Sequence, residues 1–109
     1  MVTLQLRSRQ WIVDDNGNII IGEGRKQIFE TIERTGSINQ TAKIMRMSYK
    51  GVWSKIKATE DHMQVKLVET SKKRGSSLTE EGKALLEKYA ELKKRCKTSD
   101  DKIFRSIFP

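Results

Sequence analysis

The sequence contains only one cysteine and one histidine. A single cysteine cannot form an internal disulfide, and a single histidine offers no ligand cluster for a structural metal. No apolar run approaches the roughly 20 residues that span a bilayer, and the first ten residues lack the apolar stretch of a signal peptide. The sequence therefore predicts a cytoplasmic protein with no metal, no other cofactor and no membrane partner.

Acidic residues are scarce where basic residues gather. The chain of 109 residues has the size of one domain and a formal net charge of +8. Between residues 36 and 77 there are nine basic and three acidic residues, so this window carries a net charge of +6. A local positive field of this kind favours a polyanionic partner.

The first third of the chain predicts a hairpin followed by a helix. In residues 3–22, two β-rich runs flank Asp15-Asn16-Gly17, and Asn-Gly is a strong signal for a tight turn. The next stretch, GEGRKQIFETIERTG, places Ile28, Phe29 and Ile32 on one helical face. Gly36 is the residue expected to end this helix.

Residues 36–57, GSINQTAKIMRMSYKGVWSKIK, predict two short helices joined by a tight corner. Ser37 to Gln40 form a capping box, in which a hydroxyl and an amide side chain cap the helix start reciprocally. Ser48 is a second N-cap only a few residues after the first helix. This is the spacing of a helix-turn-helix. The plainer alternative is a pair of packed helices with a solvated face.

The second of these helices has two contrasting sides at 100° per residue. Small residues allow a helix backbone to lie close to a groove wall, and lysines meet phosphates or guanine edges. One side carries Tyr49, Val52, Trp53, Ile56 and Met63. The opposite side carries Lys50, Gly51, Ser54, Lys55, Lys57 and Ala58.

A basic hairpin is predicted directly after the second helix. Val65–Thr70 is expected as a strand, 71–76 as a polar loop, and Ser77–Thr79 as a short return strand. The loop carries Lys72, Lys73 and Arg74, and its place in the order of elements is that of the wing in a winged helix. The alternative is an ordinary solvated hairpin tip.

The longest predicted helix covers residues 79–97, with Thr79 as its N-cap. Its apolar residues form a heptad seam. Such a seam packs on the domain's own core about as often as on a partner helix, and its position last in the chain favours a second copy. The seam consists of Gly82, Leu85, Tyr89, Leu92 and Cys96.

The last residues predict a separate short helix capped by Ser99. Two exposed phenylalanines are costly at about 25 cal/mol per Å² of apolar surface. Docking of this tail on the long helix or on a partner subunit is therefore expected. Its apolar face consists of Ile103, Phe104, Ile107 and Phe108.

Taken together, the elements predict an α+β, mainly α fold. It is a winged helix-turn-helix with an N-terminal β-hairpin and a long C-terminal dimerisation helix. Residues 1–98 are expected to form the DNA-binding domain, including the long helix from about residue 80, and residues 99–109 a short amphipathic tail.

The chain resembles the DNA-binding domain of the ModE family of molybdate-responsive regulators, a LysR-like winged helix. The likeness runs from about residue 3 to 95 and is carried by GEGR, GSINQTAK, MSYKGVW and LVET…LTEEG. It implies a homodimer whose second helix enters the major groove, with Ser48, Tyr49 and Lys50 at the DNA end and Trp53 turned inward. It also implies that Ser37 and Gln40 lie near the DNA backbone and that the wing lysines reach phosphates or the minor groove.

This chain departs from the family pattern in three ways. Its wing is the compact SKKRGSS, where the family has a longer, glycine-rich loop. Arg46 stands where the corner commonly has glycine, which costs about 1 kcal/mol if its φ is positive. The sequence ends where full-length regulators continue into an oxyanion-binding domain, so a link to molybdate is association alone.

These observations lead to one set of predicted site residues. Predicted DNA contacts are Ser37, Gln40, Arg46, Ser48, Tyr49, Lys50, Ser54, Lys55, Lys57, Lys72, Lys73 and Arg74. The predicted dimer interface is Leu85, Tyr89, Leu92, Cys96, Phe104 and Phe108. No catalytic site is predicted, because Tyr49, Lys50, His62 and Cys96 each have a simple structural role.

The leading hypothesis is a sequence-specific transcriptional regulator that binds double-stranded DNA as a homodimer on an inverted repeat, in the cytoplasm and associated with the nucleoid. The alternatives are an architectural or nonspecific DNA-binding protein and a winged helix used for protein contacts. An enzyme is the least favoured class. No group of residues identifies a small-molecule effector.

Overall fold

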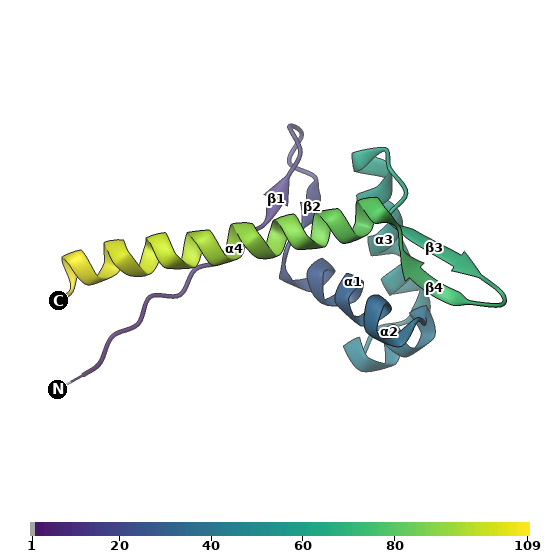
Figure 1. The fold of residues 1–109 in the computed structure, drawn as a ribbon, viewed down its shortest axis with the longest axis horizontal. Helices are drawn as coiled ribbons and strands as arrows, with labels where there is room; N and C mark the ends of the chain where they lie inside the picture. The colour runs from purple at the N-terminus through teal and green to yellow at the C-terminus, as the bar shows by residue number, and fades with distance from the viewer. Residues whose placement is uncertain (1) are drawn as a thin grey trace.

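The computed structural model describes residues 2–109. Along the chain its elements are β1 (Ile12–Val13), β2 (Ile19–Ile21), α1 (Glu23–Thr35), α2 (Ile38–Met45), α3 (Tyr49–Met63), β3 (Val68–Ser71), β4 (Gly75–Leu78) and α4 (Glu80–Ile107). The strands form two antiparallel hairpins, β1–β2 and β3–β4. Helix α4 runs along the molecule, with β3–β4 at one end and both termini at the other (Figure 1). The predicted fold class is confirmed.

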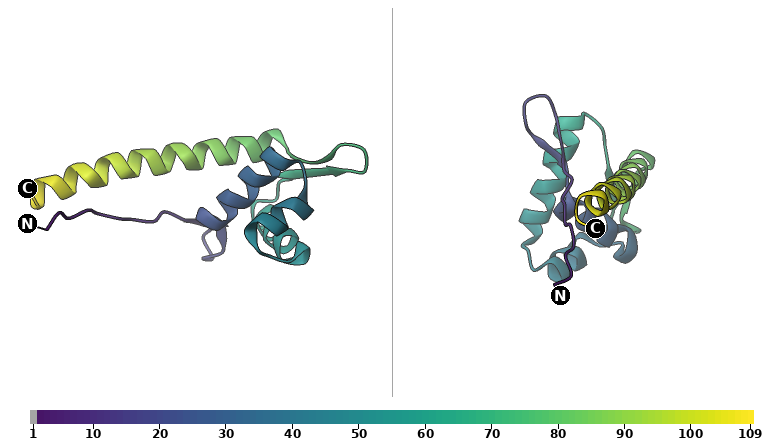
Figure 2. Two further views of the ribbon diagram at one scale, coloured as in Figure 1. Left: turned by 90° about the horizontal axis from the view of Figure 1, so that it is seen from below. Right: turned by 90° about the vertical axis from the view of Figure 1, so that its left-hand side faces the viewer.

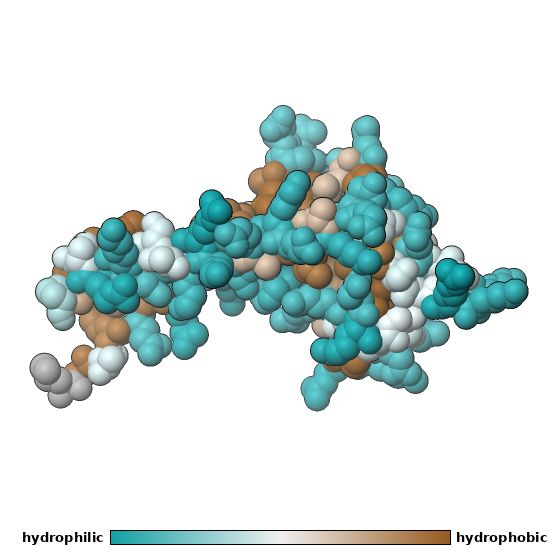
Figure 3. All heavy atoms as spheres, in the orientation of Figure 1, coloured by the Kyte–Doolittle hydropathy of each residue, from teal (hydrophilic) through white to brown (hydrophobic). Residues whose placement is uncertain are grey.

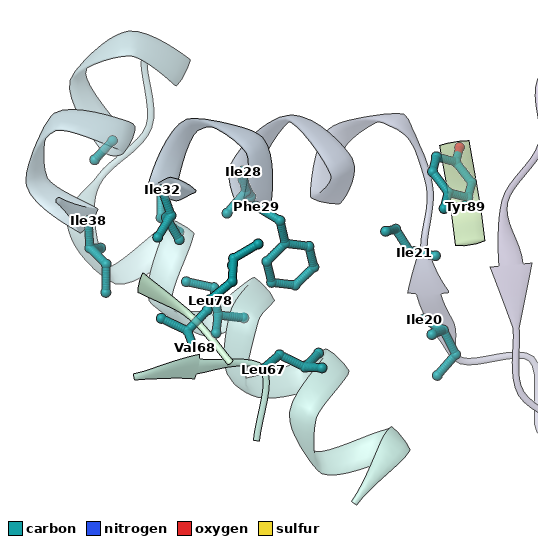
Figure 4. Close-up of a cluster of buried hydrophobic side chains, with 13 residues drawn as sticks. Ile20, Ile21, Ile28, Phe29, Ile32, Ile38, Leu67, Val68, Leu78 and Tyr89 are labelled. Atoms are coloured by element: carbon teal, nitrogen blue, oxygen red, sulfur yellow. The ribbon is translucent and has the colours of Figure 1, made fainter. Parts of the chain in front are cut away.

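The core lies where α1, α3 and the β3–β4 hairpin meet. Ile28, Phe29 and Ile32 are almost fully buried on one side of α1, as their spacing predicts. They gather with Val68 and Leu78 from the hairpin (Figure 4). Burying an aliphatic or aromatic side chain contributes about 1.5–3 kcal/mol. The helix-turn-helix is thus built on a core that also includes the second hairpin.

The N-terminal hairpin is shorter than predicted. Pairing is confined to Ile12–Val13 and Ile19–Ile21. The turn between them is held by the Asp14 carboxylate, which accepts the amide of Asn18 at 2.9 Å. Residues 2–10 form no strand and run as an extended arm beside α4 (Figure 2).

The arm is held by tertiary hydrogen bonds to α4 and not by strand pairing. The Ser8 hydroxyl donates to Asp100 at 2.8 Å, and the Tyr89 hydroxyl donates to the Gln10 carbonyl at 2.6 Å. Both partners lie on α4, far away in the sequence. A β-propensity pattern carries no information about such contacts, which is why the predicted strand extends too far.

Helix α4 is a single helix of 28 residues, and the predicted break before the tail is wrong. Thr79 is its N-cap as predicted, accepting the amide of Gly82 at 3.0 Å. Ser99 is not a cap, because it lies inside the helix. The helix continues past it with the help of a Lys97–Asp101 pair at 3.4 Å, one turn apart. The tail is therefore the last turns of α4.

Candidate DNA-binding interface

The corner between α2 and α3 consists of three residues, as predicted. Arg46 adopts the left-handed conformation with φ 55°, and its amide bonds to the Lys43 carbonyl at 3.2 Å. Ser48 then caps α3 by accepting the amide of Gly51 at 2.9 Å. The left-handed residue is not glycine, so this corner stores about 1 kcal/mol of backbone strain. Its side chain is a cation at the exposed surface.

The predicted capping box at the start of α2 is half correct. The Ser37 hydroxyl accepts the amide of Gln40 at 3.0 Å, as expected. The reciprocal bond is replaced, because the Ser37 amide instead donates to the hydroxyl of Thr35 at 3.3 Å. The Gln40 side chain is exposed at the helix start. The Gln40 side chain is therefore on the surface and free to make the contact with the DNA backbone that the resemblance implies.

Helix α3 presents one buried side and one exposed side. Val52 and Ile56 are buried, and the Thr59 hydroxyl donates to the Ile20 carbonyl at 2.8 Å. Lys50 and Lys55 are exposed on the other side. The helix is thus fixed to the core along its length while its lysines project outward.

Two residues placed by the helical wheel on the inward side are in fact exposed. Tyr49 is 48% exposed and Met63 is 37% exposed, because they are the first and last residues of α3 and extend past the core. Tyr49 is therefore exposed at the start of α3, beside the exposed residues Ser48 and Lys50. Ser54, also exposed, donates its hydroxyl to the Lys50 carbonyl at 2.7 Å.

Lys57 differs from the other predicted DNA contacts because its charge already has a partner. Its ammonium lies 3.4 Å from the Glu60 carboxylate and 5.7 Å from the centre of the Trp53 ring. Trp53 is half-buried, consistent with the inward orientation that the resemblance implies. Lys57 therefore belongs with Glu60 more than with the exposed lysines of α3.

The β3–β4 hairpin, called the wing below, is tighter than predicted. Strand register pairs Ser71 with Gly75 and leaves a turn of three residues, all exposed and all basic: Lys72, Lys73 and Arg74. The Ser71 hydroxyl accepts the amides of Lys73 and Arg74 at 3.2 and 3.3 Å. Gly75 closes the turn with φ 74°. The tip is hydrophilic and stands clear of the domain (Figure 3).

The wing is attached to the helix-turn-helix by a backbone bond. The amide of Ser76 donates to the carbonyl of Gly36 at 2.9 Å, and Gly36 is the C-cap residue of α1. A Cβ on Gly75 would collide with the same carbonyl oxygen. The close approach explains why glycine occurs at residue 75.

The apolar seam of α4 is only partly available to a partner. Tyr89, predicted in the dimer interface, is 1% exposed and packs in the domain's own core, so that assignment is wrong. Burial raises the pKa of its hydroxyl, which is held by Gln10. Leu85 is half-buried against the core, Cys96 is half-buried, and Leu92 is 39% exposed.

Two further residues join the exposed seam. Ile103 and Ile107 are 55% and 65% exposed. Counting 100° per residue, they fall within about 60° of arc with Leu92 and Cys96. The spacing of 4, 7 and 4 residues was available in the sequence. It was missed because the helix was expected to end before residue 99.

The predicted phenylalanines lie beside this seam. Phe104 and Phe108 stack on each other with ring centres 5.2 Å apart. Phe104 is half-buried, and Phe108 is 56% exposed at the end of α4. They do not fold back on α4 as a separate tail, because Phe104 lies within α4 and Phe108 is its C-cap residue.

Within residues 2–109, no cluster of three or more histidine, cysteine or acidic side chains is placed to hold a metal ion. No helix in that range is long and apolar enough to cross a membrane. The exposed side chains of this interface offer hydrogen bonding and positive charge.

Comparisons with known proteins agree with this geometry. Residues 25–83 match the family described as "Bacterial regulatory helix-turn-helix protein, lysR family". The "Molybdenum transport protein ModE" of Azotobacter vinelandii is 26% identical over 95 residues, which cover 84% of this chain and 35% of that protein. The chain thus spans about a third of the length of this relative.

Two solved structures have a similar fold. The crystal structure of the CbnR_DBD-DNA complex has a TM-score of 0.60 at 25% identity, covering 76% of this chain and 94% of that one. CbnR, a LysR family transcriptional regulator, has a TM-score of 0.58 at 27% identity, covering 72% of this chain and 27% of that one.

Proposed function

Because this chain belongs to the lysR family of bacterial regulatory helix-turn-helix proteins, we propose that it is a sequence-specific transcriptional regulator. It binds double-stranded DNA as a homodimer on an inverted-repeat operator. The observation that carries the proposal is that α3 and the wing both expose basic side chains and both pack on one core.

Helix α3 is the proposed recognition helix. Its first turn presents Tyr49 and Lys50, which reach base edges in the major groove, and Lys55 faces the phosphates. Small side chains at Gly51 and Ala58 leave the backbone free to approach the groove wall. Ser37, Gln40, Arg46 and Ser48 border this helix and are proposed to contact the DNA backbone.

The wing supplies contacts that do not depend on sequence. Lys72, Lys73 and Arg74 lie in one exposed turn and are proposed to neutralise phosphates. The window from residue 36 to 77 holds three acids, and one of them, Glu60, is buried. The positive field at this end is therefore little opposed at the surface.

The dimer is proposed to form through antiparallel α4 helices. The seam residues Leu92, Cys96, Ile103 and Ile107 all lie within residues 92–107 of α4, and all but the half-buried Cys96 are exposed. An antiparallel pair that crosses near residues 99 and 100 places these residues of one helix against the same residues of the other. They then form the apolar seam of the dimer.

A ModE-type regulator is the narrower form of this proposal, supported by the likeness to ModE over 95 residues. The operator and any effector are left open by it. A protein that acts at the chromosome would be cytoplasmic and associated with the nucleoid.

The test is selection of bound sequences from a random DNA pool at about 150 mM salt with unlabelled competitor. A palindromic motif with half-sites about one turn apart, roughly 34 Å, would support the proposal. Enrichment without a motif would favour the second candidate, an architectural binder, for which the compact basic wing is the supporting observation. No enrichment would leave the exposed seam of α4 as a protein-binding surface.

A further inference from the structure

Glu60 is a buried carboxylate at the junction between α3 and the wing. It is 5% exposed and lies one turn before the end of α3. Its Oε2 atom accepts the amide of Leu67 at 2.8 Å and the amide of Val68 at 3.1 Å. Glutamate is rarely buried to this extent without partners. The carboxylate therefore joins the recognition helix to the first residues of the wing.

The second oxygen of Glu60 faces a single cation. Oε1 has no hydrogen-bond partner within residues 2–109, but the Lys57 ammonium lies 3.4 Å away. That ammonium is also close to the Trp53 ring on the same helix. The charge of Glu60 is thus balanced by a lysine of its own helix, while the hydrogen bonds to its carboxylate come from the backbone amides at the start of the wing.

The path of the chain from α3 to the wing is short and is bonded at both ends. The chain reverses after α3 through Gln64, a left-handed residue with φ 55°, and only residues 65–67 separate this turn from β3. Leu67 is held on its other side, because its carbonyl accepts the amide of Thr79 at 2.9 Å. Leu67, directly before β3, is thus bonded both to Glu60 of α3 and to Thr79, the N-cap of α4.

We propose that Glu60 is a positioning residue for DNA binding, and the proposal rests on the proposed function of α3 and the wing. Its carboxylate sets the orientation of the recognition helix relative to the wing, so that both meet one duplex together. Replacing it by alanine leaves two backbone amides without their acceptor and frees the wing to move relative to α3. The loss appears as weaker DNA binding through the wing.

The experiment is a double-mutant cycle in the full chain. Glu60→Ala, Glu60→Asp and Glu60→Gln are compared in the natural background and with the wing neutralised by Lys72→Ala, Lys73→Ala and Arg74→Ala. Duplex affinity is measured at fixed salt. Asp61→Asn is the matched control, because Asp61 is the next residue on α3 and is exposed.

Glu60→Ala is expected to weaken binding about tenfold in the natural background, the size of a lost hydrogen bond to a charged group. The same substitution is expected to have little effect once the wing is neutral. Glu60→Asp, one methylene shorter, should show the same dependence on the wing and serves if the alanine variant does not fold. Glu60→Gln should retain most of the affinity, because its amide oxygen still accepts from Leu67 and Val68. Asp61→Asn should weaken neither background.

Hydrogen exchange in the free protein provides a second measurement. Exchange of the Leu67 and Val68 amides should be faster in Glu60→Ala and Glu60→Asp than in Glu60→Gln. Equal losses of affinity in both backgrounds, or no loss in either, would overturn the positioning role. No DNA binding by the unaltered protein would instead overturn the proposed function, and the positioning role with it. Failure of the proposed function is distinguishable from failure of the positioning role, because it is seen in the unaltered protein and needs no variant.

Discussion

The carbonyl oxygen of Gly36 accepts the amide hydrogen of Ser76 at 2.9 Å. This bond joins the boundary between α1 and α2 to the second strand of the wing. It requires the wing backbone to lie so close to Gly36 that no side chain fits at Gly75. The Glu60 carboxylate of α3 accepts the amide of Val68 on the other strand. The wing is thus attached both to α3 and to the boundary between α1 and α2.

Gly75→Ala is expected to reduce the free energy of unfolding by at least about 1–2 kcal/mol, because the residue is left-handed with φ 74°. The added Cβ also collides with the Gly36 carbonyl. Chemical denaturation measures the change. Gly24→Ala is the control, since a Cβ at that position in α1 meets nothing within 4 Å. Equal stability of the two variants would contradict the close approach.

Arg46→Gly is expected to stabilise the fold by up to about 1 kcal/mol, since glycine adopts the left-handed conformation without strain. The same substitution removes a cation near the DNA, so the salt slope of binding should fall by about 0.9. Gln64→Gly is the control, because Gln64 has the same φ of 55° at the other end of α3. It should gain stability with no change of slope. A loss of stability in both would show that neither position is strained.

Lys50→Ala and Lys73→Ala are expected to change DNA binding in two different ways. Lys50 lies at the start of the proposed recognition helix, so its loss should cost about 1–3 kcal/mol and relax specificity at one position. Lys73 lies in the wing turn and should weaken binding to all sequences alike. Titration with the selected operator and with random DNA separates the two. Uniform weakening by both would mean that α3 does not read bases.

Ile103→Ser should weaken the proposed dimer, because Ile103 is 55% exposed in the seam of α4. Sedimentation analysis over a range of concentrations would report the shift toward monomer. Phe108→Ser is the comparison, since Phe108 lies beside the seam and should have a smaller effect. An unchanged dimer in Ile103→Ser would remove this seam from consideration.

Asp14 is expected to make the hairpin turn sensitive to acid. Hydrogen bonds from the Asn18 side chain and backbone hold the pKa of its carboxyl below the ordinary value of about 3.9. A lowered pKa means that the stabilisation is present above the ordinary value and is lost as pH falls through the folded one. Asp14→Ala should therefore cost more stability at about pH 6 than at about pH 2. Asp15→Ala, at the exposed neighbour, is the matched control.

Local signals in the sequence predicted the fold well. Ser48 and Thr79 cap the helices as expected, and the period of Ile28, Phe29 and Ile32 gave the buried side of α1. These features depend on residues within one or two turns of each other. A sequence pattern is sufficient for them.

The errors concern contacts between distant residues. A heptad pattern does not say whether Tyr89 faces its own core or a second copy, and the answer depends on the arm that binds its hydroxyl. In the sequence Glu60 is only one of three acidic residues between residues 36 and 77, and its burial follows from the turn at Gln64 that returns the chain to it. Ser99 had the residue type of a cap without the break in the helix that a cap requires.

The uninterrupted course of α4 has a consequence for the spacing that the proposed dimer tolerates. Its 28 residues form a stiff helix about 42 Å long. An antiparallel pair of such helices has no hinge between the two DNA-binding domains. One base pair added between the half-sites rotates the second by about 35° around the duplex. A rigid pair cannot follow that rotation, so its operators should share one fixed half-site separation.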